Sequence, residues 1–352
     1  MSDSTIDQLF STMGSTTSLQ AASELLWQHY GLRGSASPLN SERDQNFRID
    51  GDDGRQYVLK LTHPAEARGV TDFQTRALLH AASRDPSLPI PRVIPRLDGE
   101  PYAAITLPDG TQRVLRLLSY LHGQPLHQIM RSAAQRRHLG YTLGRLDVAL
   151  GDFSHPSAGH ALLWDIQHSD RLQPLLAELP AGERTATLAA FLQHFVRDIQ
   201  PALAGLRRQV IHNDLNPYNV LVDPQEQITT CGLIDFGDMV QAPLINELAV
   251  ACSYQLSGNA NPLDSAAELI AGYHQACPLL REEVLLLYDL ILTRLCMTVT
   301  ITGWRAARYP DNQTYILRNN GLSWDGLQRL GALDRAEAQA FLLQVCGMKG
   351  QA

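Results

Sequence analysis

The chain is poor in charged residues and lacks paired cysteines. Charged residues make up 18% of its 352 residues, and the formal net charge is −7. A mildly acidic surface argues against a nucleic-acid partner, which needs a basic face to neutralise phosphates. The five cysteines are scattered and no CxxC pair indicates zinc. They are therefore expected to be reduced core thiols of a cytoplasmic protein.

No apolar run predicts a membrane span. The most apolar stretch, residues 284–299, contains Asp289 and Arg294, whereas a span requires about 20 predominantly apolar residues. A buried helix is the better interpretation, and no membrane partner is expected. Residues 1–18 carry early acids, Ser and Thr without a signal-like apolar run, and are expected to form a flexible leader. The oligomeric state stays open.

What the chain does contain is a pair of motifs between Val210 and Asp238. In HNDLNPYN (residues 212–219), Asp214 and Asn219 lie five residues apart on a predicted loop followed by a short strand. A second predicted strand, residues 229–234, ends at Asp235 in the sequence DFG. Phosphoryl transfer needs a carboxylate that orients the attacking hydroxyl, and amide and carboxylate oxygens that hold Mg²⁺ against the triphosphate. Ordinary turn chemistry would explain each piece alone, but not all three in this order.

With these residues, the chain resembles the aminoglycoside phosphotransferase and choline kinase superfamily, closest to the hydroxylysine kinase-like group. The resemblance covers about residues 20–330 and also uses the segments 41–47, 57–60, 116–121 and 247–250. It implies a two-lobed α+β fold like that of protein kinases. Residues 19–121 would form a nucleotide-binding N-lobe with an antiparallel sheet, and residues 122–352 a larger, mainly helical C-lobe that carries catalysis and acceptor binding.

The resemblance assigns roles to the acidic residues. Asp214 would orient the acceptor hydroxyl and take its proton late in the transfer. Asn219 and Asp235 would hold Mg²⁺ with waters completing its shell. Asp238 would bind the ammonium of an acceptor or a second Mg²⁺, the alternative being a cap or turn role. Glu247 would brace the catalytic loop.

The nucleotide would be bound by residues of the N-lobe. No GxGxxG precedes the predicted hairpin at residues 46–61, so Ser41 and Asn46 would help to present amides and polar groups to the phosphates. Lys60 closes a predicted strand where the lysine that binds the α- and β-phosphates is expected. Gln74 stands where many kinases place the glutamate that pairs with this lysine, and an amide cannot neutralise the ammonium.

The lysine's partner therefore stays open, with Asp72 and Glu66 as nearby acids. Ser119 and Leu121 would address adenine from the hinge between the lobes. Helices are expected at residues 19–30, 71–82, 136–150, 186–199, 244–255, 265–275 and 282–306 from their 3.6-residue periodicity or long apolar faces.

The expected activity is transfer of the γ-phosphate of ATP or GTP to a hydroxyl of a small, cationic amine or amino acid, with hydroxylysine as the family-level guess. Kinases of homoserine, choline or an aminoglycoside are the alternatives, because superfamily members share the phosphate apparatus and differ in acceptor. A regulatory pseudokinase is a further alternative. Intact Lys60, Asp214, Asn219 and Asp235 argue against it, and Gln74 argues weakly for it.

Overall fold

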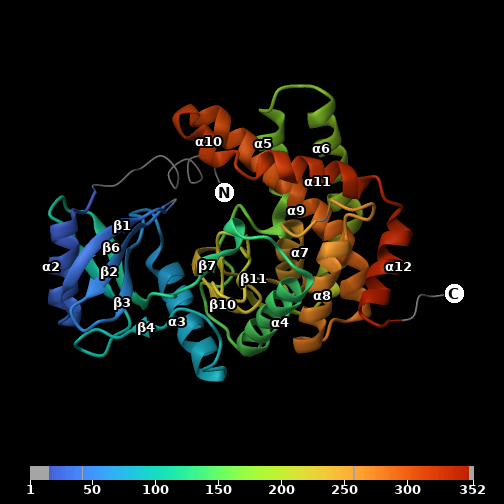
Figure 1. Cartoon of the computed structure of the whole chain (residues 1–352). Coiled ribbons are helices and arrows are strands. Elements are labelled where there is room, and N and C mark those ends of the chain that lie inside the picture. Colours follow the sequence, from blue (N-terminus) through green and yellow to red (C-terminus); the bar gives the residue numbers. More distant parts are fainter. Residues whose placement is uncertain (1–15, 42, 257, 349–352) are drawn as a thin grey trace. The chain divides into compact units, whose positions relative to one another are not determined.

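A computed structural model of the chain describes residues 16–41, 43–256 and 258–348 (Figure 1). Most of the predicted leader, residues 1–15, lies outside the described part. The chain divides into two compact units. Unit 1 runs to His122 and includes His155–Ala161 and Gly232–Ile234, two segments that the predicted division gave to the C-lobe. Unit 2 comprises the remaining residues.

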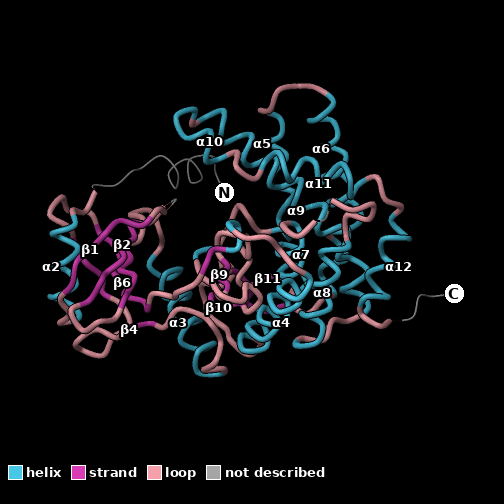
Figure 2. The backbone as a smooth tube through the Cα atoms, in the orientation of Figure 1, coloured by secondary structure: helices cyan, strands magenta, loops and turns pink. Residues whose placement is uncertain are grey.

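In its described residues, unit 1 contains an antiparallel sheet and the helices α2 and α3 (Figure 2). The strand order is β1-β2-β3-β6-β4, and β5 pairs with β6. Its elements are α2 (Leu19–Tyr30), β1 (Gly34–Leu39), β2 (Gln45–Gly51), β3 (Gln56–Leu61), α3 (Arg68–Arg84), β4 (Val93–Ile94), β5 (Ala103–Thr106) and β6 (Gln112–Ser119).

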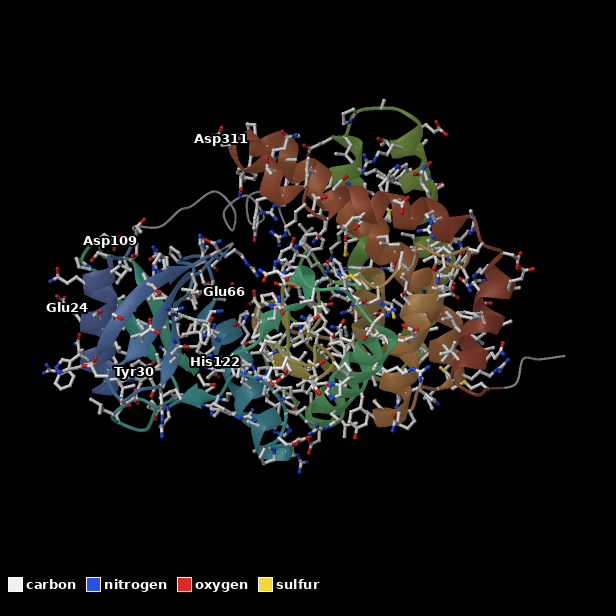
Figure 3. The ribbon with its side chains drawn as sticks, viewed as in Figure 1. Glu24, Tyr30, Glu66, Asp109, His122 and Asp311 are labelled. Atoms are coloured by element: carbon white, nitrogen blue, oxygen red, sulfur yellow. The ribbon has the colours of Figure 1, made fainter. Side chains whose placement is uncertain are left out.

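Alternation along β2 and β3 gives the sheet one apolar and one polar face. Phe47 and Ile49 of β2 are buried in the same cluster as Leu26 and Tyr30 of α2. Figure 3 labels Tyr30, the last residue of α2. Since successive side chains point to opposite faces, the residues that alternate with Phe47 and Ile49 lie on the other face. Burying the apolar face stabilises the fold by about 25 cal/mol per Å² of apolar surface removed from water. This burial sets the orientation of both strands, and so decides which side chains lie on the polar face.

Unit 2 is mainly helical and has two small sheets, ordered β10-β9-β7 and β11-β8. Its main elements are β7 (Gln124–Pro125), α4 (Ala133–Leu150), α5 (Gln173–Ala177), α6 (Glu183–His194), β8 (Arg208–Ile211), β9 (Val220–Val222), β10 (Thr230–Leu233), β11 (Val240–Pro243), α7 (Ile245–Ser253), α8 (Asp264–Ala276), α9 (Arg281–Arg308), α10 (Gln313–Ile316), α11 (Asn320–Gly331) and α12 (Arg335–Val345); the last two residues of β10 group with unit 1. Short 3₁₀ or π segments lie at Leu126–Gln128, Ile166–Leu172, Phe195–Ile199, Pro201–Gly205, Phe236–Asp238 and Pro310–Asn312.

Helix α9 forms the core of unit 2. By length and composition alone this helix is long and apolar enough to cross a membrane, but 89% of its apolar 18-residue segment is buried inside the protein. Its neighbours include α7, α11 and α12. The prediction of a buried helix at this position is confirmed, and the helix carries Arg294 into the interior with its side chain only 2% exposed.

Helices α4 and α8 touch at their backbones. A Cβ atom at Gly140 would overlap the carbonyl oxygen of Leu269, and one at Gly272 would overlap that of Arg137. This approach brings the hydroxyl of Tyr273 on α8 within 2.5 Å of Asp147 Oδ2 on α4, to which it donates a hydrogen bond.

Candidate active site

The catalytic loop follows β8, which pairs with β11. Asn213 has a φ of 66°, a left-handed conformation that costs a non-glycine residue roughly 1–2 kcal/mol. Glu247, in the first turn of α7, accepts hydrogen bonds from the backbone N–H groups of His212 and Asn213. The ring of His212 accepts the N–H of Asp214 at its Nδ1, 3.2 Å away. Because the side chains of Glu247 and His212 accept hydrogen bonds from N–H groups of the loop, the backbone position of Asp214 is fixed.

The Asp214 carboxylate is held by two amides and one guanidinium. Asn216 Nδ2 donates to both of its oxygens at 3.1 and 3.0 Å, and Asn219 Nδ2 donates to Oδ2 at 2.8 Å. Arg294 Nη2 lies 3.7 Å from Oδ1. The side chain keeps 21% of its surface exposed, so an incoming hydroxyl can reach a carboxylate whose orientation is already set.

Negative charge accumulates around this carboxylate. Burial raises the pKa of Asp214, and the charges of Asp238 and Asp235 raise it further, while Arg294 and the hydrogen bond from Asn216 lower it. The net direction is upward. Negative charges near a carboxyl group disfavour its ionisation, so a cation added here would favour the ionised form of Asp214.

The residues predicted to bind Mg²⁺ fit that ion. Asn219 uses Nδ2 for both of its side-chain hydrogen bonds, and within the described residues its Oδ1 accepts none. Asp235 is exposed where β10 has just ended, at a φ of 62°. No group of three or more His, Cys, Asp or Glu that could hold a metal occurs in the described ranges. Mg²⁺ does not require one, because it binds one or two carboxylates together with waters and substrate phosphates.

Unit 1 carries the candidate phosphate-binding residues on the polar face of its sheet. Asn46 of β2 lies directly opposite Lys60 of β3. Lys60 Nζ is 3.7 Å from Asp44 Oδ2, and Asp44 Oδ1 accepts the N–H of His63 at 3.0 Å. Asn46 Oδ1 is buried without a donor in the part of the chain that is described. The exposed Ser41 lies three residues before Asp44. An ammonium and a buried polar atom without a partner, side by side on one face, suit a phosphate ligand.

The sequence left the partner of Lys60 open, and the structure gives Asp44 as its ion-pair partner. Lys60 pairs with Asp44, while Gln74 Oε1 accepts a hydrogen bond from Arg116 Nη2 at 3.2 Å. Asp72 instead pairs with Arg76 and His155. The reason lies in the strand register. Arg116 of β6 stands directly opposite Lys60, and its longer, forked side chain takes the amide oxygen.

The predicted adenine-binding segment borders a cavity of about 750 Å³ within unit 1, to which Ser119 and Tyr120 contribute. Ser119 Oγ accepts the N–H of Arg92 at 2.8 Å, and Tyr120 N–H donates to Gln56 O at 3.1 Å. Leu121 N–H makes no backbone hydrogen bond to a described residue. That leaves an amide donor beside the cavity, as the role assigned to Leu121 requires.

Sequence reasoning missed Arg294, Asp44 and Arg116. Arg294 gives one signal in the sequence, a charge inside an otherwise apolar helix, and this signal argues only against a membrane span. Asp44 lay inside the predicted phosphate loop but was not singled out. Arg116 carried no local signal, because its place beside Lys60 depends on the pairing of β3 with β6.

Comparisons with known proteins show the family and the fold of the chain. Residues 35–283 match the model of the phosphotransferase enzyme family, and the chain belongs to that family. It is 25% identical to hydroxylysine kinase of Mus musculus over 332 residues, which is 88% of each chain. A microcompartment-associated aminopropanol kinase has a similar structure, with a TM-score of 0.66 at 20% identity, covering 94% of this chain and 99% of that one. An amicoumacin kinase in complex with AMP-PNP, Ca²⁺ and Ami gives a TM-score of 0.63 at 14% identity, covering 86% and 91%. The predicted α+β, kinase-like fold and small-molecule kinase activity are confirmed.

Proposed function

We propose that this phosphotransferase transfers the γ-phosphate of ATP or GTP to a hydroxyl of a small amine or amino acid, with a hydroxylysine-like acceptor. The observation that carries the proposal is the Asp214 carboxylate, oriented by Asn216 and Asn219 and accompanied by Arg294. The hydroxylysine kinase relative from mouse supports the acceptor class. The amicoumacin kinase complex with AMP-PNP supports an adenine nucleotide as donor.

In this mechanism Asp214 accepts a hydrogen bond from the acceptor hydroxyl and thereby orients the hydroxyl oxygen toward the γ-phosphorus. The proton moves to Asp214 late, so the residue acts mainly by positioning. Asn219 Oδ1 and Asp235 would hold Mg²⁺, which when bound neutralises charge on the transferring phosphoryl group. Lys60 would leave Asp44 to contact the α- and β-phosphates, and Asn46 would contact the same triphosphate. Ser119 and Leu121 would meet the base.

Homoserine, choline and an aminoglycoside remain alternative acceptors, since the residues that would bind phosphate, metal and hydroxyl could act on the hydroxyl of any of these molecules. A regulatory pseudokinase is the alternative from another class. A scaffold has no need for Asn219 to keep Oδ1 free of hydrogen bonds within the described residues while Nδ2 holds Asp214. This arrangement therefore favours catalysis.

A product-mass screen tests the proposal. The protein is incubated with Mg²⁺ and ATP or GTP against hydroxylysine, homoserine, choline, ethanolamine and an aminoglycoside. We expect a mass increase of one phosphoryl group on a hydroxylated amine or amino acid. The Asp214→Asn variant should lose this product while its nucleotide affinity changes less than a few-fold, because the carboxylate faces the acceptor. Nucleotide binding without any product from the whole panel would favour the pseudokinase.

A further inference from the structure

Arg318 stands out among the arginines of unit 2 that lie over aromatic rings. It follows α10, and the 3₁₀ turn before α10 contains Asp311, which Figure 3 labels. Its guanidinium carbon lies 3.9 Å from the centre of the Tyr315 ring and 4.8 Å from that of Tyr218. Tyr218 belongs to the catalytic loop and stacks in turn on His127, with ring centres 4.1 Å apart. Arg318 therefore rests on a supported aromatic platform beside the catalytic residues.

This cation has no anionic partner within the described residues. Arg318 forms no side-chain hydrogen bond or ion pair there, and its Nε is buried without an acceptor. Three other arginines of unit 2 with a described ring contact each have a polar partner. Arg294 over Trp164 reaches Asp214, Arg308 over Trp304 pairs with Glu178, and Arg184 over Trp324 donates to Asn320.

Stacking leaves the hydrogen-bonding edge of a guanidinium free. The ring contacts are made by the guanidinium carbon, and the side-chain N–H groups of Arg318 have no acceptor among the described residues. These N–H groups form the fork that matches a carboxylate or phosphate. A partly buried, unpaired guanidinium with this geometry is a preorganised anion receptor.

Tyr218 links the receptor to the reaction centre. Its N–H donates to Asn216 Oδ1 at 2.8 Å, and Asn216 Nδ2 donates to both oxygens of Asp214. The ring of Tyr218 is also the one that lies 4.8 Å from the guanidinium carbon of Arg318. A small molecule whose hydroxyl reaches Asp214 can therefore place a second functional group toward Arg318.

The position of Arg318 in the chain favours the acceptor over the nucleotide as the source of the anion. The match to the family model ends at residue 283, whereas Arg318 comes 35 residues later. Donor chemistry is common to the family and acceptor chemistry is not, so a receptor outside the matched region suits the acceptor.

We propose that Arg318 binds the carboxylate of the acceptor, so that this kinase acts on a hydroxylated amino acid rather than on an amino alcohol, choline or an aminoglycoside. The inference rests on the proposed function and deepens it. The amine end of such a zwitterion would lie toward the Asp214 and Asp238 carboxylates, and its carboxylate toward the stacked guanidinium.

Paired acceptors and a matched variant test the proposal. Phosphoryl transfer to 5-hydroxylysine and homoserine is compared with transfer to their carboxamides, for the native protein and for Arg318→Gln. We expect the native protein to prefer the carboxylates. Arg318→Gln should raise KM for the carboxylates ten-fold or more, to near the carboxamide value, with KM for the carboxamides and the nucleotide unchanged within two-fold. Arg308→Gln is the control, because it also removes a stacked arginine of unit 2, and it should leave all these constants unchanged.

A purely structural role for Arg318 would change both members of each acceptor pair equally, and that result would overturn the proposal. A rise in nucleotide KM alone would identify the anion as a phosphate and also overturn it. Arg318→Lys keeps the charge but not the fork, so it should restore part of the preference, and thermal unfolding of each variant checks that it is folded.

Calorimetric binding of the same pairs in the presence of a non-hydrolysable nucleotide separates the two hypotheses. Carboxylate-dependent binding that Arg318→Gln abolishes supports the Arg318 site even if no product forms, in which case the proposed kinase activity fails by itself. Product from amino alcohols only, with no carboxylate preference, leaves the activity intact and rejects the role of Arg318. Neither product nor carboxylate-dependent binding rejects both.

Discussion

Arg294 brings a buried guanidinium to within 3.7 Å of the Asp214 carboxylate. Its Nη1 donates to the carbonyl oxygen of Trp164 at 2.8 Å, and its guanidinium carbon lies 5.0 Å from the centre of the Trp164 ring. The arginine is therefore held by the interior of unit 2 as well as by the carboxylate. A cation fixed in this way offsets the negative charge around Asp214 before any ligand binds.

Replacing Arg294 by Gln should lower kcat ten-fold or more, because Asp214 would lose its fixed cation while Asp238 and Asp235 still repel it. Steady-state kinetics with saturating nucleotide and acceptor measure the effect. Arg308→Gln serves as the matched control, since Arg308 also lies over a tryptophan and pairs with a carboxylate. An unchanged kcat in a folded Arg294→Gln protein would remove the arginine from the catalytic arrangement.

Replacing Asp235 by Ala should abolish the Mg²⁺ dependence of nucleotide binding as well as turnover, because metal and phosphates bind as one unit. Nucleotide titrations with Mg²⁺ and with EDTA measure the difference. The surface variant Asp325→Ala is the control, as that side chain is 65% exposed on α11. If Asp235→Ala retained the native metal dependence, the metal would have to bind elsewhere.

Replacing Asp238 by Asn distinguishes its two proposed roles. If the residue binds an acceptor ammonium, KM for an amine-bearing acceptor should rise about ten-fold or more, a loss of about 1.4 kcal/mol, with a smaller change for the nucleotide. An equal rise in KM for Mg²⁺–nucleotide would identify a second-metal ligand. No change in either constant would return Asp238 to a role within the 3₁₀ turn Phe236–Asp238.

The stability of the protein should depend on the protonation of Glu247. Burial raises its pKa from 4.5 to about 7, against the lowering effect of the N–H groups of Asn213 and His212 and of Arg294. Since the folded state holds this proton more tightly, the contribution of Glu247 to the free energy of unfolding is complete below about pH 4.5 and decreases as the pH rises through 7. The loss is about 3 kcal/mol.

Urea unfolding of the native protein and of Glu247→Gln between pH 5 and 8 measures this contribution. The variant should show a flatter dependence of unfolding free energy on pH, with Asp325→Asn as an exposed control. Parallel curves for the native protein and Glu247→Gln would show that Glu247 titrates alike in the folded and unfolded states.

Local patterns predicted most of the regular elements. Residues 19–30 form α2 as expected, because the hydroxyl of Ser18 caps the first turn and Gly31 ends the helix at a φ of 66°. The helix predicted at 282–306 is α9 with slightly wider bounds. Strand β1 (Gly34–Leu39) was missed, since its Gly, Ser and Pro residues have weak strand signals and its pairing with β2 stabilises it.

Residue types and spacing led to the predicted roles of Asp214, Asn219 and Lys60, because these roles depend on residues within short motifs. The partners of these residues were not predictable in the same way. Asp44 reaches Lys60 through strand pairing, and Arg294 reaches Asp214 from a helix 80 residues later. Such contacts depend on tertiary packing, which spacing along the chain does not encode.

The backbone contact between α4 and α8 restricts which residues can stand at positions 140 and 272, far apart in the chain. Residues 140 and 272 have no room for a Cβ atom, so even alanine at either position would push the helices apart. Separation would pull Tyr273 away from Asp147 and leave a buried carboxyl group without its donor. Libraries that diversify this enzyme for new acceptors should therefore keep both glycines fixed and place their variation after residue 283, where a change of specificity need not disturb the helix pair.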